Sequence, residues 1–259
     1  MGTVKKPVSA KERIILALDV DDFESAKALV VELKDYVGFF KVGLQLITSC
    51  GMEVVDMIHK QGGKVFYDAK FHDIPNTVAR ASANLVRRGV TFFDIHIKGG
   101  SKMLNTTMKL VNETVKKYEL PEPTILGVTL LSSFGQRTLN QELNVDLNID
   151  DYVASLAKMA KEACLDGVVA SASEVSQIRK ICGEGFIIVC PAIRPTWSVV
   201  DDQVRVVTPT DAVLAGVDYM VVGRPIINAE NKIDAVNLII DEIENALLVK
   251  FGEGAGEGR

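Results

Sequence analysis

The sequence predicts an α/β protein of the (β/α)8 (TIM) barrel class, folded as a single domain. Eight short apolar runs alternate along the chain with segments whose apolar residues recur at helical spacing. Most runs are apolar throughout, which is typical of parallel strands buried on both faces. The 259 residues contain no linker between the eight units, and such barrels usually have about 250 residues. A doubly wound open sheet is the alternative that this pattern leaves open.

The first four strand–helix units are delimited by composition and by helix-end residues. Val, Phe and Tyr favour strand in the third run. The helix that follows it has Pro75 near its start and ends in Arg87, Arg88 and Gly89, which suit a helix C-terminus. The expected strands are 14–19, 37–43, 64–70 and 90–97. The expected helices are 22–36, 52–60, 75–88 and 101–118.

The last four units show the same alternation of strand and helix, with longer loops between them. Asp150 or Asp151 is a candidate cap for the fifth expected helix. Residues 132–135 open a long polar loop, and residues 193–208 form a second loop that contains Pro195. The expected strands are 124–131, 167–171, 185–192 and 217–223. The expected helices are 150–164, 173–181, 210–215 and 233–249.

The ends of the chain differ in composition from its middle. Residues 1–10 lack the apolar core of a signal peptide and are predicted to be a flexible N-terminal segment. Residues 251–259 are rich in Gly and Glu and are predicted to be a flexible tail. The catalytic barrel is therefore expected to occupy residues 11–250.

Composition narrows the classes of function. A net charge of −5 argues against broad nucleic-acid binding, which favours a basic surface. No stretch approaches the roughly 20 apolar residues of a membrane helix. Four cysteines without a C-x-x-C pair are typical of thiols in a reducing cytoplasm. Three histidines without a clustered pattern predict no built-in metal site. We expect a cytoplasmic protein that binds neither nucleic acid nor membrane.

Charged residues gather at the end of the third strand. Asp68 and Lys70 are two residues apart, so both are expected on the same side of the strand, and Asp73 follows in the turn before the next helix. A surface ion pair stabilises a protein by only about 0–1 kcal/mol, and a buried set is costly to desolvate. The cluster is therefore more easily explained by chemistry than by stability. A solvated charge cluster in a loop is the alternative.

Other strand ends also carry polar residues, which a barrel would bring to the mouth where its active site lies. Asp19 could instead cap the helix near residue 22, Lys41 could extend out of its apolar run, and Ser132 could be a plain loop hydroxyl. His96 is expected to be structural. The candidates are Asp19, Lys41, Asp68, Lys70, His96, Ser132, Gly223 and Arg224.

A phosphate site is predicted after the last strand. Loops after the seventh and eighth barrel strands commonly bind phosphate, and the fork of donors on Arg224 matches phosphate oxygens. A surface arginine after a turn is the alternative. Residues 191–195 would form the opposite wall, where Arg194 could be structural and hold loop carbonyls.

These motifs together resemble the orotidine 5′-monophosphate decarboxylase family from about residue 14 to about residue 246. The most specific match is the run from Asp68 to Thr77, which fits the pattern D-x-K-x-x-D-I-P-x-T. Supporting segments are 16–19, 41–43, 193–195, 202–205, 208–209 and 222–225.

The resemblance implies the cofactor-free decarboxylation of orotidylate to uridylate, the last step of pyrimidine nucleotide synthesis. It implies that Lys70 protonates C6 and that Asp68 lies near the departing carboxylate. It further implies a homodimer in which Asp73 and Thr77 reach into the neighbouring subunit's site. The implied catalytic residues are Lys70, Asp68, Asp73 and Lys41. The implied substrate-binding residues are Asp19, Lys41, Ile74, Thr77, Ser132, Pro191, Arg194, Gln203, Gly223 and Arg224, without cofactor or metal.

One departure and two rival functions remain. Ala192 stands where the family usually has glycine, and alanine is comfortable only at negative φ, so the approach of this loop to phosphate is expected to differ slightly. Decarboxylases and synthases of sugar phosphates share D-x-K-x-x-D but typically use a metal ion. A non-catalytic nucleotide-binding barrel is the second rival, which the intact Asp68, Lys70 and Asp73 disfavour.

Overall fold

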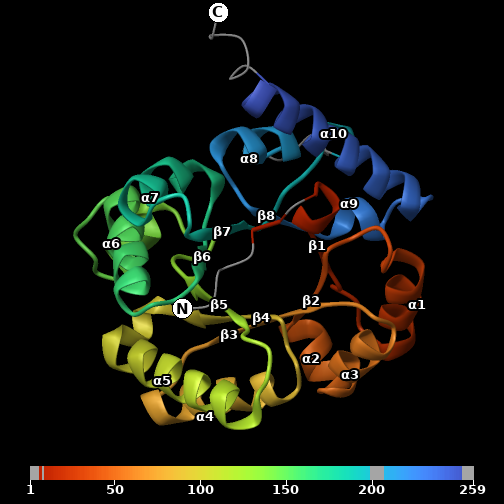
Figure 1. Ribbon diagram of the computed structural model, residues 1–259. Helices are drawn as coiled ribbons and strands as arrows, with labels where there is room; N and C mark the ends of the chain where they lie inside the picture. Colours follow the sequence, from red (N-terminus) through yellow and green to blue (C-terminus); the bar gives the residue numbers. More distant parts are fainter. Residues whose placement is uncertain (1–5, 8, 199–206, 253–259) are drawn as a thin grey trace, which may run out of the picture. The chain divides into compact units, whose positions relative to one another are not determined.

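The computed structural model describes residues 6–7, 9–198 and 207–252. Its eight strands follow the chain order from β1 to β8 in one closed barrel (Figure 1). The strand pairs whose register is resolved are all parallel. This order confirms the (β/α)8 barrel and rules out the open doubly wound sheet, because an open sheet has two unpaired edge strands.

The contacts within the chain divide it into two compact units. The central unit comprises Val65–Val189, and the terminal unit comprises Lys6–Lys64 together with the chain from Cys190 onward. The limits 11–250 for the catalytic domain stay a prediction. The last helix ends at Gly252 and so includes the first two residues of the predicted tail, and residues 253–259 lie outside the described part. Among the helices described, none combines the length and apolarity needed to cross a bilayer.

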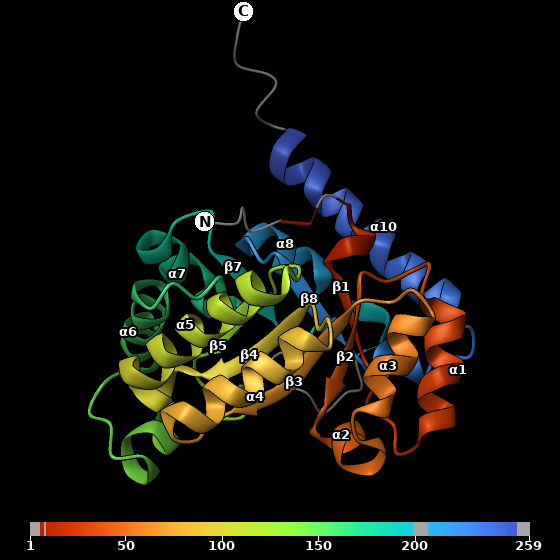
Figure 2. The same cartoon turned by 60° about the horizontal axis from the view of Figure 1, so that its bottom comes forward.

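Three strands and six helices of the terminal unit are described. The strands are β1 (Ile14–Ala17), β2 (Phe39–Gly43) and β8 (Tyr219–Val222), and all their residues are buried. β1 pairs with both neighbours, with Leu16 opposite Phe40 and Val222. The helices are α1 (Phe23–Leu33), α2 (Leu44–Cys50), α3 (Glu53–Lys60), α8 (Pro209–Ala215), α9 (Arg224–Ile227) and α10 (Lys232–Gly252). α8 packs beside α10 (Figures 1 and 2).

Local hydrogen bonds explain where two of these helices begin. The Asp22 side chain accepts the N–H of Ser25 at 2.8 Å and so caps α1. At α8, Thr208 and Asp211 form a reciprocal capping box, and Pro209 occupies the first turn. Both starts are specified by the local sequence.

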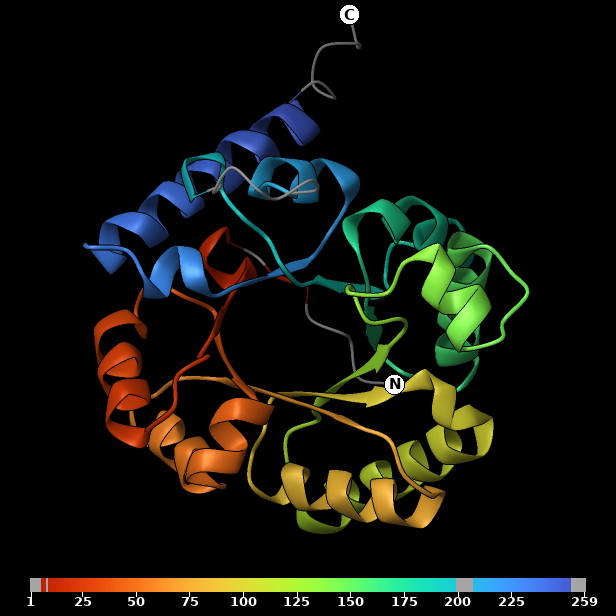
Figure 3. The same ribbon diagram turned by 180° about the vertical axis from the view of Figure 1, so that it is seen from behind.

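The central unit supplies the remaining strands, together with four helices and three short helical turns. Its strands are β3 (Val65–Phe71), β4 (Phe92–His96), β5 (Thr124–Val128), β6 (Gly167–Val169) and β7 (Ile187–Cys190), whose last residue begins the second part of the terminal unit. Its helices are α4 (Pro75–Arg87), α5 (Gly100–Tyr118), α6 (Ile149–Glu162) and α7 (Val175–Cys182), and the turns are Ile97–Gly99, Thr138–Glu142 and Ala172–Glu174. α4 packs against α5 (Figure 2), and α6 packs against α7, both green in Figure 3.

The structure corrects the predicted elements at several points. α2 was not predicted because Gly43 precedes it and no side chain caps it. α9 has only four residues, too few to show a helical period. The predicted loop after β5 contains the π-helical turn Thr138–Glu142. β5 and β7 end at Val128 and Cys190, before the predicted ends, since backbone pairing stops before the apolar run does.

Candidate active site

The carboxyl end of β3 carries an ion pair between the two residues that the sequence singled out. Lys70 Nζ donates a hydrogen bond to Asp68 Oδ1. The Asp68 side chain is 12% exposed and that of Lys70 is 30% exposed, so the pair is partly shielded from water. This shielding strengthens the attraction relative to that of a fully exposed pair.

β3 is irregular at this pair. Tyr67 lies opposite Phe93 and Phe71 lies opposite Ile95, so β3 advances four residues where β4 advances two. Within this bulge, Lys70 has a φ of 49°, in the left-handed region that L-residues rarely adopt. Bulges of this kind often re-aim a side chain next to an active site.

Asp94 on β4 lies beside the bulge. It is 1% exposed, and its Oδ1 accepts the main-chain N–H of Lys70 at 2.8 Å. The pKa of Asp94 is raised well above its usual value, first by burial and then by the charge of Asp68 and a hydrogen bond with it, while Lys70 acts in the opposite direction. Burial and the neighbouring charge of Asp68 therefore both favour the protonated form of the Asp94 carboxyl group.

Two histidines lie near this cluster. The rings of His72 and His96 are 5.2 Å apart, and His96 Nδ1 is buried with no hydrogen-bond partner among the described residues. Burial is the main reason why the pKa of His96 is lowered to about 4, and the charges of Lys98 and His72 act in the same direction. His96 is thus neutral at pH 7. A structural histidine was expected to have its hydrogen bonds satisfied, and the unpaired Nδ1 of His96 differs from that expectation.

Asp73, Ile74 and Thr77 lie exposed where α4 begins. Asp73 Oδ1 accepts the N–H of Ile74 at 2.6 Å, and the Thr77 N–H donates to the carbonyl of Ile74. Ile74 is 68% exposed, which is unusual for a large apolar side chain. The three residues therefore form an exposed surface at the start of α4.

Ser132 lies in the segment after β5. Its side chain is exposed, and the chain turns just beyond it, where the Phe134 N–H donates to the carbonyl of Leu131. Lys98 Nζ lies 5.6 Å from the centre of the Phe134 ring, a cation–π contact that ties this turn to the end of β4.

In the terminal unit, β1 and β2 bring a second ion pair together. Lys41 on β2 is only 9% exposed, and its Nζ lies 3.2 Å from Asp19 Oδ1 just after β1. A Cβ at Gly43 would lie 2.8 Å from Lys41 Nζ, so glycine leaves the space that the ammonium needs. A Cβ at Gly223, after β8, would lie 3.5 Å from Asp19 Oδ2. Three strand ends thus meet around Asp19.

The predicted phosphate residues lie in the loops after β7 and β8. Arg224 is exposed at the first position of α9, and the N–H of Arg194 donates to the carbonyl of Val207 across its loop. Ala192 has a φ of 60°, so the alanine adopts the conformation that a glycine would hold without strain. Gln203 lies outside the described residues.

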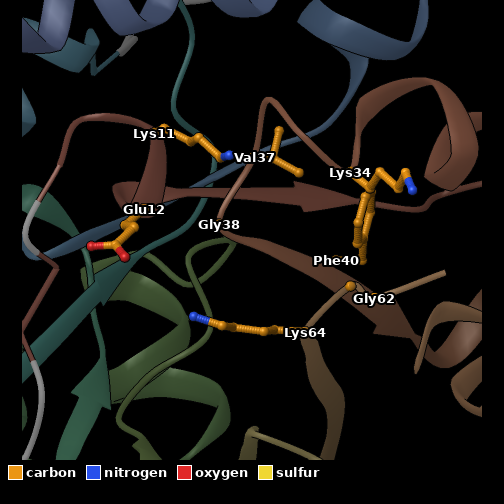
Figure 4. Close-up of a pocket in the computed structure, with 9 residues that line it drawn as sticks. Lys11, Glu12, Lys34, Val37, Gly38, Phe40, Gly62 and Lys64 are labelled. Carbon is orange, nitrogen blue, oxygen red and sulfur yellow. The ribbon is translucent and has the colours of Figure 1, made fainter. Parts of the chain in front are cut away.

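The terminal unit also has a cavity of about 180 Å³, which lies at the amino ends of β1 and β2 (Figure 4). Gly38, just before β2, lines it together with Lys11, Lys34 and Lys64. Lys41 and Asp19 belong to the carboxyl ends of β2 and β1. The cavity is therefore separate from the candidate active-site residues.

The described residues hold no group of three His, Cys, Asp or Glu side chains placed to bind one metal ion. All four cysteines are free thiols.

A family model described as "Orotidine 5'-phosphate decarboxylase / HUMPS family" matches residues 12–239. The chain belongs to this family. A protein from Syntrophomonas wolfei named orotidine 5′-phosphate decarboxylase is 46% identical over 238 residues, which are 92% of this chain and 100% of that protein. One of the same name from Geotalea daltonii is 46% identical over 234 residues, 90% of this chain and 97% of that protein.

A solved structure supports the same family relationship. The crystal structure of orotidine 5′-phosphate decarboxylase from Lactobacillus acidophilus matches with a TM-score of 0.79 and 34% identity, over 92% of this chain and 99% of that one. The family resemblance expected from the D-x-K-x-x-D-I-P-x-T run is thus confirmed over nearly the whole barrel.

Sequence reasoning missed Asp94 as a neighbour of the Asp68–Lys70 pair. The signal was present as a single carboxylate within the apolar run Phe92, Phe93 and Ile95 of β4. A lone charge inside a strand buried on both faces is costly unless it has partners. Those partners belong to β3, which only the folded structure brings to Asp94.

Proposed function

We propose that this protein converts orotidine 5′-monophosphate to uridine 5′-monophosphate and CO2 without a cofactor, as a step of pyrimidine synthesis. The observation that carries the proposal is the paired Lys70 and Asp68 at the carboxyl end of β3, within the most specific family motif. The names of the 46% identical relatives support the choice of substrate. The proposed location is the cytoplasm, where free thiols such as these four are usual.

The proposed chemistry needs one proton and one fixed positive charge. The bond between C6 and the carboxylate breaks, CO2 leaves, and the electron pair stays on C6. The Lys70 ammonium stabilises this developing carbanion and transfers its proton to C6, and the resulting amine regains a proton from water. A preorganised charge aimed at a developing opposite charge is often the largest catalytic contribution. Asp68 supports the role of Lys70, because a neighbouring carboxylate favours the ammonium form.

We assign Asp68 a second role at the substrate carboxylate. If that carboxylate binds next to Asp68, the repulsion between the two anions is relieved as CO2 departs. The low exposure of the Asp68 side chain, 12%, supports this assignment, because the repulsion between the two carboxylates would be weaker in bulk water.

The remaining contacts are assigned by family position and by local geometry. Lys41 and Asp19 are proposed to bind the ribose hydroxyls, and Ser132 the pyrimidine base. Lys41 is held by Asp19 and kept nearly out of water, which suits a fixed donor. Pro191, Arg194, Gln203, Gly223 and Arg224 are proposed to hold the phosphate. The exposed guanidinium of Arg224 at the start of α9 supports this role.

We further propose that the protein is a homodimer in which Asp73, Ile74 and Thr77 contact the substrate bound by the neighbouring subunit. All three are exposed at the start of α4 in the single chain. The large apolar side chain of Ile74 is 68% exposed there, which supports the proposal that a second subunit covers it in the dimer. Asp73 would then add a second carboxylate to the partner's Lys70 ammonium.

The experiment is to mix the purified protein with orotidylate and follow the loss of ultraviolet absorbance, with and without a chelator. Conversion to uridylate at the same rate under both conditions is the expected result. The Lys70→Ala variant is the control for contaminating activity. A well-folded protein that leaves orotidylate unchanged would contradict the proposal.

The metal-using sugar-phosphate enzymes are the second candidate, because the description of the matching family model extends beyond orotidylate decarboxylases. The Ile74-Pro75-x-Thr77 extension and the loop from Ile193 favour orotidylate. Turnover of a sugar phosphate that requires Mg²⁺, in the absence of orotidylate turnover, would establish this second candidate instead.

A further inference from the structure

Asp94 fills a gap that the bulge in β3 opens in the sheet. Between the Tyr67–Phe93 and Phe71–Ile95 pairs, the two extra residues of β3 interrupt the ladder to β4. The N–H of Lys70 is taken up there by the Asp94 side chain at 2.8 Å. A buried N–H without an acceptor costs about 1–3 kcal/mol, so this contact helps to hold Lys70 at its unusual φ of 49°.

The second carboxyl oxygen of Asp94, Oδ2, has a different hydrogen-bonding environment. Asp94 Oδ2 is buried, and no donor among the described residues hydrogen-bonds to it. Its polar neighbour is the carboxylate of Asp68, which as an anion can only accept. A hydrogen bond between the two carboxyl groups therefore requires a proton, and the more deeply buried Asp94 is the group that holds it.

We propose that Asp94 is a positioning residue that holds both members of the Asp68–Lys70 pair, with Oδ1 accepting the main-chain N–H of Lys70 and a protonated Oδ2 donating to Asp68. The inference rests on the proposed function, which gives Lys70 and Asp68 their chemical roles. Asp94 touches no reacting atom. It fixes the main chain that carries the ammonium and the carboxylate that pairs with it.

The charge of the three groups follows from this arrangement. A neutral Asp94 leaves Asp68 and Lys70 with a combined charge of zero, whereas an ionised Asp94 would add a buried negative charge beside Asp68. That charge would repel both Asp68 and an incoming anionic carboxylate. A neutral donor at this position is therefore compatible with binding an anionic substrate group.

The other groups around Asp94 in the central unit do not take over the role of the proton. The charged groups that face it are Asp68 and Lys70 from β3. On β4, His96 is neutral at pH 7, and Leu126, opposite Asp94 on β5, is apolar. The proton on Asp94 thus compensates for burial next to Asp68.

Two substitutions that share the branching of aspartate at Cγ separate this role from simple packing. Asp94→Asn keeps an oxygen to accept from Lys70 and an N–H to donate to Asp68, but it cannot ionise. Asp94→Leu keeps the branching of the side chain at Cγ, is larger, and loses both hydrogen bonds. We expect Asp94→Asn to retain kcat within about threefold, because both hydrogen bonds persist. We expect Asp94→Leu to lower kcat by about 100-fold with KM changed only a few-fold, since small misplacements of a catalytic group are costly.

A spectroscopic measurement tests the proton without turnover. In protein labelled with ¹³C at the aspartate carboxyl carbons, the Asp94→Asn spectrum identifies the Asp94 signal by its absence. The wild-type signal should keep the chemical shift of a protonated acid through pH 7. This measurement also serves if the Leu variant does not fold, and it remains valid if the wild type fails to convert orotidylate, a result that would contradict only the proposed function.

Three results would overturn the role of Asp94. The first is an Asp94 carboxyl signal that titrates near pH 4. The second is a folded Asp94→Leu variant with wild-type kcat. The third is an Asp94→Asn variant as impaired as Asp94→Leu, which would mean that a negative charge at this position is required.

Discussion

Lys70 and Ala192 are residues of the candidate site that hold positive φ angles, of 49° and 60°. Each stands at the end of a strand, where the backbone must change direction. A left-handed conformation costs an L-residue about 1–2 kcal/mol, and such strain tends to be retained at functional sites. At Lys70 the strain accompanies a hydrogen bond to Asp94, while at Ala192 it falls on a residue whose Cβ makes this conformation less favourable than it is for glycine.

Removing the ammonium tests its role most directly. Lys70→Ala should lower kcat by about 10³-fold or more, because it deletes the group proposed both to stabilise the carbanion and to donate the proton. Binding of uridylate should change little. Steady-state kinetics and calorimetric titration measure the two effects. Lys64→Ala, which removes an exposed lysine at the start of the same strand, is the matched control and should retain kcat. Substantial turnover by Lys70→Ala would show that another group donates the proton.

Replacing Ala192 by glycine tests the strain at this position. Ala192→Gly should raise the free energy of unfolding by about 0.5–1 kcal/mol, because glycine adopts a φ of 60° without steric cost. Urea unfolding measures the change. The control is Ala28→Gly at an exposed position of α1, which should lower the free energy by about 1 kcal/mol. A loss of similar size at both positions would mean that Ala192 is not strained.

At the scale of elements, short polar links tie neighbouring strands of the central unit together. Asp166 precedes β6, and its side chain accepts the N–H of Ile125 on β5 at 2.7 Å. Its carbonyl accepts the N–H of Ile187 on β7 at 3.0 Å. One residue therefore connects to both neighbours of β6. Burial raises the pKa of the Asp166 carboxyl to about 6.

This raised pKa makes stability depend on pH. The folded state binds the Asp166 proton more tightly than the unfolded state, so its contribution is complete below pH 4 and is lost as the pH rises towards 6. The expected loss is up to about 1.4 kcal/mol per pH unit in that window. Asp166→Asn should therefore gain stability relative to the wild type between pH 4 and pH 7, measured by urea unfolding at both values. Parallel pH profiles of the two proteins would contradict this assignment.

At the scale of the whole molecule, the family match covers residues 12–239 and so includes parts of both compact units. The candidate residues are divided in the same way. The central unit contributes the Asp68–Lys70 pair with Asp94, and the terminal unit contributes the Lys41–Asp19 pair with Gly223. The exposed start of α4 adds the residues proposed to act on a second copy of the chain.

Subunit mixing tests this shared arrangement. Lys70→Ala and Asp73→Ala subunits, each inactive alone, should recover up to about one quarter of wild-type activity when mixed, because every mixed dimer has one intact site. Mixing Lys70→Ala with Asp68→Ala is the control, since both residues serve the site of their own subunit and no intact site forms. Absence of recovery in proven mixed dimers would show that Asp73 does not act across the interface.

The sequence by itself determined the order of strands and helices and the positions of the charged strand ends. Apolar runs and helical spacing are local properties, so the strands of Ile14–Ala17 and Val65–Phe71 and the helix beginning at Pro75 could be read along the chain. The Asp68–Lys70 pair was equally accessible, because residues two apart on a strand share a face. Two short helices, α2 and α9, lacked such local signals.

Only the tertiary structure decided what surrounds these charges. The bulge in β3 depends on its register with β4, and the raised pKa of Asp94 depends on burial and on Asp68 from the neighbouring strand. The left-handed φ of Ala192 is set by the loop it closes rather than by alanine's own preference. Register, burial and loop closure arise between segments distant in sequence, which is why no local pattern specified them.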